Sequence, residues 1–89
     1  AHLTRIQARV LAPEVRVNAI APGALLRPID WSDKRWAAIA EATPLKCSGS
    51  PDDVSQAVLF FADADFVTGE ILTVDGGRHL GPDGPPISV

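Results

Sequence analysis

Two short apolar runs, each closed by a glycine-containing turn, constrain this sequence most. The first run, residues 15–20 (VRVNAI), is followed by Pro22-Gly23, and the second, residues 70–74 (EILTV), is followed by Asp75 and two glycines. Proline cannot donate a hydrogen bond to a sheet, and glycine adopts backbone angles that other residues avoid. A long connection with helical patterning lies between the runs, as parallel strands require. The sequence therefore predicts two neighbouring parallel strands joined by a helical crossover.

The first twelve residues, AHLTRIQARVLA, predict an amphipathic helix. Leu3, Ile6 and Val10 recur at spacings of three and four with arginines between them. Pro13 disfavours helical geometry in the residue before it, so the helix should end near Ala12. No capping residue or acidic first turn opens the segment. We expect the end of a longer helix, with a frayed N-terminus as the alternative.

Two further helices are predicted over residues 32–42 and 50–62. A serine, a preferred N-cap, begins each of them. In the second, Pro51 occupies the first helical position and Asp52 and Asp53 the first turn, where the helix dipole favours negative charge. Asp53 also has the spacing of a capping box, so the two carboxylates indicate capping rather than catalysis. The apolar face should pack on a flat apolar surface and comprises Val54, Ala57, Val58 and Phe61.

Composition limits the chain to one small domain and excludes several classes of ligand. Domains of 89 residues bury a modest fraction of their surface, so a partner is expected to stabilise this one. A formal charge of -3 offers no basic field for nucleic acid. Cys47, the single cysteine, is expected to be a passive thiol, and with two histidines it makes no metal-binding spacing. No apolar run approaches the ~20 residues of a membrane helix, so we expect a cytoplasmic protein.

The motifs VRVNAIAPG, SPDDVSQAVLFFA and FVTGEILTVDGG, in this order, resemble the C-terminal third of short-chain dehydrogenases/reductases over residues 1–80. The resemblance implies an α/β fold in which the chain supplies the last two strands of a Rossmann-type, doubly wound parallel sheet. Residues 1–80 would be the C-terminal portion of one reductase domain and residues 81–89 a Gly/Pro-rich tail. The family's catalytic Tyr-x-x-x-Lys would lie upstream, because this chain has no tyrosine and its lysines, Lys34 and Lys46, lie in other segments. The chain alone is therefore not expected to be active.

A cofactor site is expected where the first strand ends, because ligands of open α/β sheets bind outside the carboxyl ends of the strands. The resemblance implies that Pro22, Gly23, Ala24 and Leu25 wall the nicotinamide of NADPH. Arg27 stands where many family members have a threonine, so the hydroxyl near the nicotinamide is absent. From the residues alone, a plain strand end at Pro22-Gly23 stays open as an alternative.

The substrate is expected to be a pterin. The stretches PGALLRP, TPLKCSGSPDDV and VDGGRHLG are most similar to those of bacterial pteridine and dihydromonapterin reductases. Leu26 and Trp36 are the candidates for substrate contact, with core packing of Trp36 as the alternative. Three other interpretations remain: a reductase of acyl-carrier, sugar or alcohol substrates, a non-catalytic binding module, and an unrelated small domain that folds alone.

Two polar features are assigned structural roles. Asn18 lies within the first strand and should bond to the loop of a neighbouring strand. Asp75-Gly76-Gly77 should be a turn without a following helix N-terminus to receive a phosphate. By resemblance, the last strand and the tail should contact other subunits of a homotetramer, where His79 either reaches a neighbouring active site or is solvated.

Overall fold

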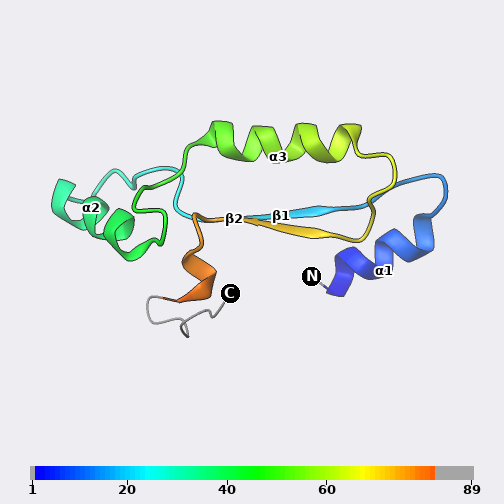
Figure 1. Ribbon diagram of the computed structural model, residues 1–89, viewed down its shortest axis with the longest axis horizontal. Helices are drawn as coiled ribbons and strands as arrows, with labels where there is room; N and C mark the ends of the chain where they lie inside the picture. Colours follow the sequence, from blue (N-terminus) through cyan, green and yellow to red (C-terminus); the bar gives the residue numbers. More distant parts are fainter. Residues whose placement is uncertain (1, 82–89) are drawn as a thin grey trace, which may run out of the picture.

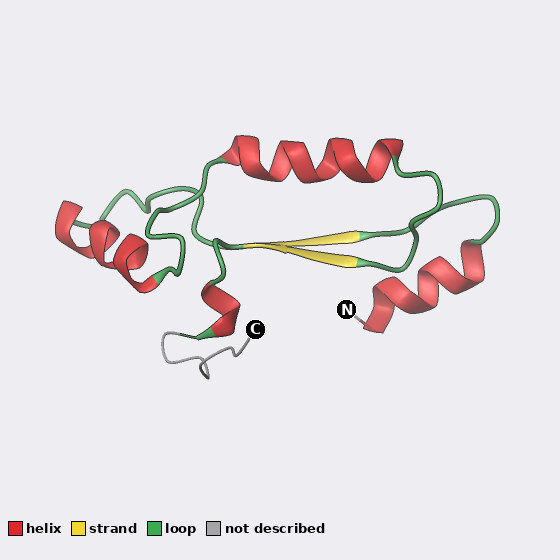
Figure 2. Cartoon of the chain, in the orientation of Figure 1, coloured by secondary structure: helices red, strands yellow, loops and turns green. Residues whose placement is uncertain are grey.

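The computed structural model describes residues 2–81. Their elements are α1 (His2–Leu11), β1 (Ala19–Pro22), α2 (Asp33–Ala42), α3 (Pro51–Asp63), β2 (Ile71–Val74) and a single-turn 3₁₀ helix, η1 (Arg78–Leu80). The strands form a parallel pair with Ala19 opposite Ile71 and Pro22 opposite Val74. Helix α3 lies on one side of the strands and α1 and η1 on the other (Figure 1, Figure 2). The predicted parallel crossover is confirmed.

The first strand begins later than the sequence predicted. The expected strand covered residues 15–20, whereas β1 runs from Ala19 to Pro22. The residues before Ala19 bond to the segment that leads into β2. The Val17 N–H donates to Thr68 Oγ1 at 3.1 Å and the Val17 carbonyl accepts from the Gly69 N–H at 2.7 Å. Regular pairing starts only where β2 starts, because the described residues offer β1 a single partner strand.

Pro22 is part of the strand rather than its terminator. The Ala19 N–H donates to the Glu70 carbonyl and the Gly23 N–H to the Val74 carbonyl, each at 2.9 Å. Every second residue from Ala19 to Gly23 therefore directs its backbone N–H and carbonyl toward β2. Pro22 is one of the residues in between. Its nitrogen, which has no hydrogen to donate, faces the open edge, so no bond of the ladder is lost.

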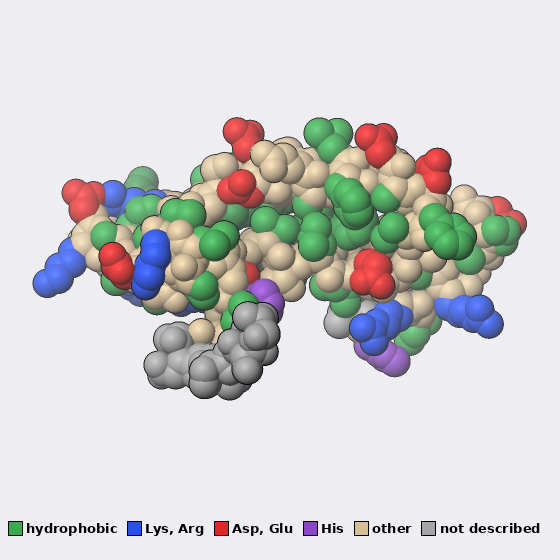
Figure 3. Space-filling view, viewed as in Figure 1, with side chains coloured by type: hydrophobic (Ala, Val, Ile, Leu, Met, Phe, Trp, Pro, Cys, Tyr) green, Lys and Arg blue, Asp and Glu red, His purple; other side chains and the backbone are tan. Residues whose placement is uncertain are grey.

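Helix α3 covers one face of the sheet, as its apolar pattern predicted. It contacts both strands, and apolar side chains gather between it and the strands (Figure 3). Ala57 is buried and Val54 and Phe61 are half-buried. Val58 is 51% exposed, because two strands are narrower than the apolar face of the helix. Val58 instead lines an open groove with Ile20, beside the free edge of β1.

Ser32 and Ser50 occupy the predicted N-cap positions of α2 and α3. The Ser32 Oγ accepts from the Arg35 N–H at 3.1 Å, which satisfies a free donor of the first turn of α2. At the start of α3, the Asp53 Oδ2 accepts from the Ser50 N–H at 2.7 Å. The capping role predicted for Asp53 is confirmed.

Two side chains at the amino end of β1 fasten the crossover. The Arg16 guanidinium donates to the carbonyls of Phe61, Ala62 and Ala64 at 2.6, 3.1 and 2.9 Å, and so caps the C-terminus of α3, whose last turn holds no basic residue. The Asn18 amide donates to the Val67 carbonyl at 3.1 Å and its oxygen accepts from the Glu70 N–H at 3.0 Å. The structural role predicted for Asn18 is confirmed.

The buried core is small. Only Ala8, Thr43 and Ala57 of the described residues are buried, and Leu3, Val10 and Phe66 are among many large apolar side chains that are exposed. No helix in residues 2–81 combines the length and apolarity needed to cross a membrane. That region also contains no cluster of three potential metal ligands.

Candidate functional site

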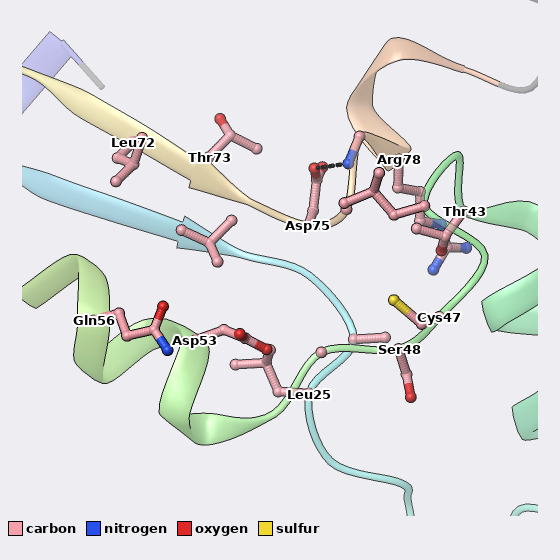
Figure 4. Close-up of a pocket in the computed structure, with 16 residues that line it drawn as sticks. Leu25, Thr43, Cys47, Ser48, Asp53, Gln56, Leu72, Thr73, Asp75 and Arg78 are labelled. Atoms are coloured by element: carbon pink, nitrogen blue, oxygen red, sulfur yellow. Dashed lines mark hydrogen bonds between the residues drawn. The ribbon is translucent and has the colours of Figure 1, made fainter.

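Three loops meet at the carboxyl ends of the two parallel strands. They follow β1 (residues 23–26), join α2 to α3 (residues 43–50) and follow β2 (residues 75–77). Together with the start of α3 they surround a cavity of about 430 Å³ (Figure 4). The residues that line it include the apolar Leu25, Leu45, Leu72 and Val74 and the polar Thr43, Cys47, Gln56, Asp75 and Arg78. This is the end of the sheet at which open α/β folds bind ligands.

Glycines allow the loop after β1 to lie against both of the other loops. A Cβ on Gly23 would lie 2.7 Å from the Asp75 Cβ, and a Cβ on Gly49 would lie 2.8 Å from the Leu25 Cδ2. Distances this short exclude a side chain unless a neighbour moves. The Gly49 N–H also donates to the Ala24 carbonyl at 3.0 Å. The backbone of residues 23–25 is therefore held from two sides.

The other two loops are held to each other in the same way. A Cβ on Gly76 would lie 2.6 Å from the Thr43 Cγ2, and the Leu45 N–H donates to the Gly76 carbonyl at 3.1 Å. The Thr43 hydroxyl donates to the Ile39 carbonyl at 2.8 Å, which ties this contact to the end of α2. Thr43 is 4% exposed, and no motif in the sequence marked it as a contact residue.

Asp75 organises the turn after β2. Its carboxylate accepts from the backbone N–H groups of Gly77 and His79, each at 2.9 Å, and lies 2.9 and 3.0 Å from His79 Nδ1. Partial burial opposes ionisation, but the hydrogen bonds and charge of His79 and the N–H of Gly77 outweigh it and lower the pKa of Asp75. This pair was not predicted from the sequence, although an aspartate and a histidine four residues apart directly after a strand could have indicated it.

The turn at Asp75-Gly76-Gly77 is confirmed, with one correction. A helix does follow it, the single 3₁₀ turn η1, because the Leu80 N–H donates to the Gly77 carbonyl at 2.9 Å. The Asp75 carboxylate already occupies the N–H groups at its start, so η1 offers no phosphate site. His79 is half exposed and paired with Asp75 rather than simply solvated.

The structure divides the predicted site residues into two sets. Ala24 and Leu25 line the cavity, and Gly23 fixes the loop that carries them. Pro22 ends β1 with its ring exposed and does not line the cavity. The two predicted substrate contacts, Leu26 and Trp36, also lie outside it.

Trp36 contributes to a small aromatic cluster beside the site. Its ring meets that of Trp31 edge to face, with 6.2 Å between centroids, and the Arg35 guanidinium lies 3.8 Å from the centroid of Trp31. Arg27 braces the same loop, since it donates to the Trp31 carbonyl at 3.1 and 2.8 Å and pairs with Asp33. The Arg27 side chain thus bonds within its own loop, at the position where the resemblance implies a threonine in many relatives.

The backbone after Gly23 has groups that fit a nicotinamide. The Gly23 N–H and the Ala24 carbonyl are bonded within the protein, whereas within residues 2–81 no protein acceptor meets the N–H of Ala24 or Leu25. Free N–H groups beside the apolar Leu25 side chain suit a planar ring that carries a carboxamide oxygen.

Comparison with known proteins establishes the family. A protein-family model described as enoyl-(acyl carrier protein) reductase matches residues 1–79, and the chain belongs to the short-chain dehydrogenase/reductase family. It is 46% identical over 81 residues to a protein of Streptomyces violaceoruber named for ketoacyl reductase 2 of granaticin polyketide synthase, covering 86% of this chain and 32% of that protein. It is 41% identical over 80 residues to the dihydromonapterin reductase of Citrobacter koseri, covering 89% of this chain and 33% of the relative.

Solved structures agree on the fold. A small-chain dehydrogenase in complex with NADPH superposes with a TM-score of 0.81 at 32% identity, covering 90% of this chain and 39% of that one. A short-chain dehydrogenase from Leptospira borgpetersenii with bound NAD⁺ gives a TM-score of 0.76 at 35% identity, covering 86% of this chain and 31% of that one. The chain spans about a third of the length of these relatives, and its fold is the C-terminal part of their Rossmann-type α/β fold.

Proposed function

We propose that the complete protein is an NADPH-dependent reductase in which this chain forms one wall of the nicotinamide and substrate pockets. The observation that carries the proposal is the loop after β1, where Gly23 lets the backbone lie against Asp75 and where, within residues 2–81, no protein acceptor meets the N–H groups of Ala24 and Leu25. The NADPH complex of a related dehydrogenase supports the cofactor class. We propose NADPH rather than NAD⁺, although the short-chain dehydrogenase from Leptospira borgpetersenii holds NAD⁺.

The residues of this chain would position the reactants rather than transfer a proton. When bound, NADPH supplies a hydride to the substrate. The Ala24 and Leu25 N–H groups would orient the nicotinamide carboxamide, and the Leu25 side chain would exclude water from the ring. The acid must come from upstream sequence, since this chain contains no tyrosine and the Lys46 Nζ donates to the Glu41 carbonyl at 2.8 Å.

A dihydropterin is the proposed substrate. The dihydromonapterin reductase of Citrobacter koseri is 41% identical to this chain over 80 residues. In this chain the segment after β1 holds the exposed Leu26, Trp31 in the loop and Trp36 in α2, side chains suited to a flat heteroaromatic ring. Trp36 and Leu26 would reach the substrate from the loop side, outside the cavity described above.

Ketoacyl reduction is the second candidate. It is favoured by the 46% identity to the Streptomyces protein named for that activity. An acyl substrate is long and flexible, so it would need a channel rather than a stack of aromatic rings.

Steady-state kinetics on the full-length protein distinguish the candidates. NADPH oxidation would be followed with a dihydropterin and, separately, with a β-ketoacyl thioester. We expect turnover of the dihydropterin, and Trp36→Ala should raise its KM about tenfold through loss of a ring contact. Phe66→Ala, which removes an exposed aromatic side chain that does not line the cavity, is the control. Turnover of the thioester alone would overturn the pterin proposal, and the absence of turnover and of NADPH binding would overturn the reductase assignment.

We also propose that the complete protein is a homotetramer that uses the β2 side of this chain. Within residues 2–81 the outer edge of β2 has no partner strand, and α3 exposes Leu59 and Phe60, at 64% and 56%. Residues 82–89, which the sequence assigned to the same contact, lie outside the described residues. Light scattering of the full-length protein would test the assembly, and a monomer would overturn it. The cytoplasmic location stays a prediction.

A further inference from the structure

Asp75 lines the site and has no role in the proposed chemistry. Asp75 is 11% exposed, accepts hydrogen bonds from two backbone N–H groups and is paired with the His79 ring. Its position after β2 places it directly against the loop that follows β1. A Cβ on Gly23 would lie only 2.7 Å from the Asp75 Cβ, so there is no space for a side chain between the two.

Two routes connect Asp75 to the backbone that faces the nicotinamide. The short route is the close packing of Asp75 against Gly23. The next two residues, Ala24 and Leu25, carry the N–H groups that meet no protein acceptor within residues 2–81. The long route starts from the turn that the carboxylate holds, because the Gly76 carbonyl accepts from the Leu45 N–H at 3.1 Å. The loop that contains Leu45 reaches Gly49, which donates to the Ala24 carbonyl at 3.0 Å.

The geometry assigns Asp75 as a positioning residue: by fixing the turn after β2, it holds the Gly23–Leu25 backbone in the conformation that binds the nicotinamide of NADPH. This inference rests on the proposed function. His79 is the partner that completes the arrangement, since its ring fixes the carboxylate between the two backbone donors. Neither residue touches the substrate or the cofactor in this assignment.

The test is NADPH affinity of the full-length protein, measured by fluorescence titration, with thermal stability measured in parallel. Asp75→Asn retains the size of the side chain but replaces one acceptor oxygen with a donor, so one of its three partners is lost. We expect a dissociation constant for NADPH about tenfold higher, with KM for NADPH raised in proportion. The kcat should be nearly unchanged, because the displaced loop weakens NADPH binding but does not alter the chemical step once NADPH is bound.

Arg16→Ala is the matched control. Arg16 bonds to three carbonyls at the opposite, amino end of the strands, so its loss should lower the melting temperature without changing NADPH affinity. Equal NADPH affinity in Asp75→Asn, Arg16→Ala and the unmodified protein would show that Asp75 is only structural and would overturn the inference.

A second variant keeps the test decisive if Asp75→Asn does not fold. His79→Ala removes the ring contact but retains both backbone hydrogen bonds to Asp75, so a two- to threefold loss of NADPH affinity is expected. An unchanged affinity in this variant would again overturn the inference. Failure of the unmodified protein to bind NADPH is a separate result, which would overturn the proposed function itself.

Discussion

At the scale of single residues, Gly23 stands where the neighbouring loop leaves no room for a Cβ, although its backbone angles are not unusual. Gly23 is required because of space, since a Cβ there would lie 2.7 and 2.8 Å from the Asp75 Cβ and Cα. Backbone of a strand end cannot move aside as easily as the tip of a side chain. The two neighbouring loops would have to separate to accept any larger residue.

Gly23→Ala in the full-length protein should therefore lower the free energy of unfolding by about 1–3 kcal/mol, the usual cost of overpacking. Gly49→Ala is the control, because its added Cβ would meet the flexible end of Leu25, at 2.8 Å from the Cδ2. Chemical denaturation should show the larger loss for Gly23→Ala. Equal losses would contradict the assignment of Gly23 to a rigid contact.

Lys46 carries the strain of a left-handed backbone, with φ of 60°. Such a conformation costs a residue with a Cβ about 1–2 kcal/mol and costs glycine little, although glycine loses more entropy on folding. Lys46→Gly should thus be about 1 kcal/mol more stable than Lys46→Ala, a comparison in which both variants lack the hydrogen bond to Glu41. Thermal denaturation of the two variants measures the difference, and a more stable alanine variant would rule out backbone strain.

The lowered pKa of Asp75 predicts an acid-sensitive contribution to stability. A carboxylate with a folded-state pKa below its unfolded value stabilises the native state fully above the unfolded value of about 3.9. The contribution is lost as pH falls through the lower, folded pKa. The stability advantage of the unmodified protein over Asp75→Asn should be constant from pH 7 to about pH 5 and then shrink on acidification. Urea denaturation at a series of pH values checks this, and an advantage that grows toward low pH would contradict it.

At the scale of elements, the crossover helix is secured by a side chain that precedes β1. The Arg16 guanidinium is partly buried and satisfies three carbonyls at the C-terminus of α3, where the helix dipole favours a cation. Its ion pair with Asp65 is long, at 3.9 Å, and the Asp65 side chain is 95% exposed. The hydrogen bonds to the carbonyls, rather than the ion pair, therefore carry the stabilisation.

Arg16→Ala should cost about 2 kcal/mol of unfolding free energy, as expected for charge-assisted hydrogen bonds, and Arg16→Lys should recover part of it. Asp65→Asn should change stability by less than about 0.5 kcal/mol, because exposed ion pairs contribute little. Denaturant titration of the three variants in the full-length protein measures the order. A cost for Asp65→Asn equal to that of Arg16→Ala would assign the effect to the ion pair instead.

At the scale of the whole molecule, the chain is more open than a compact domain of its size. Its accessible surface is 6923 Å², against about 5,000 Å² for a compact protein of this mass. The radius of gyration is 16.0 Å, against about 12 Å for a compact domain of this length. Two strands with one covered face bury too little apolar surface to offset the conformational entropy of ordering the chain.

The isolated chain should consequently melt without a cooperative transition, or aggregate, when followed by circular dichroism. Mixing it with the upstream part of the reductase, expressed separately, should restore a cooperative melt, because the free edge of β1 and the groove beside it would then be covered. A sharp reversible melt of the isolated chain would support the remaining alternative, a small domain that folds alone.

The sequence by itself determined what depends on local interactions. Serine and proline at the start of α3, the apolar spacing along that helix and the glycines after β2 each act within a few residues, so caps, helices and turns were predictable. The strand pair was predictable as well, because a long helical connection between two buried strands is typical of a parallel pair. The role of Asn18 was predictable because a polar side chain inside a strand must find a partner.

Only the tertiary structure decided which distant residues meet. The start of β1 at Ala19 depends on where β2 begins, and the tolerance of Pro22 depends on which edge its nitrogen faces. The contact of Gly23 with Asp75 joins loops that are far apart in sequence and leaves no periodic signal. Contacts of this kind are set by the register of two strands, and register is a property of the folded pair rather than of either segment.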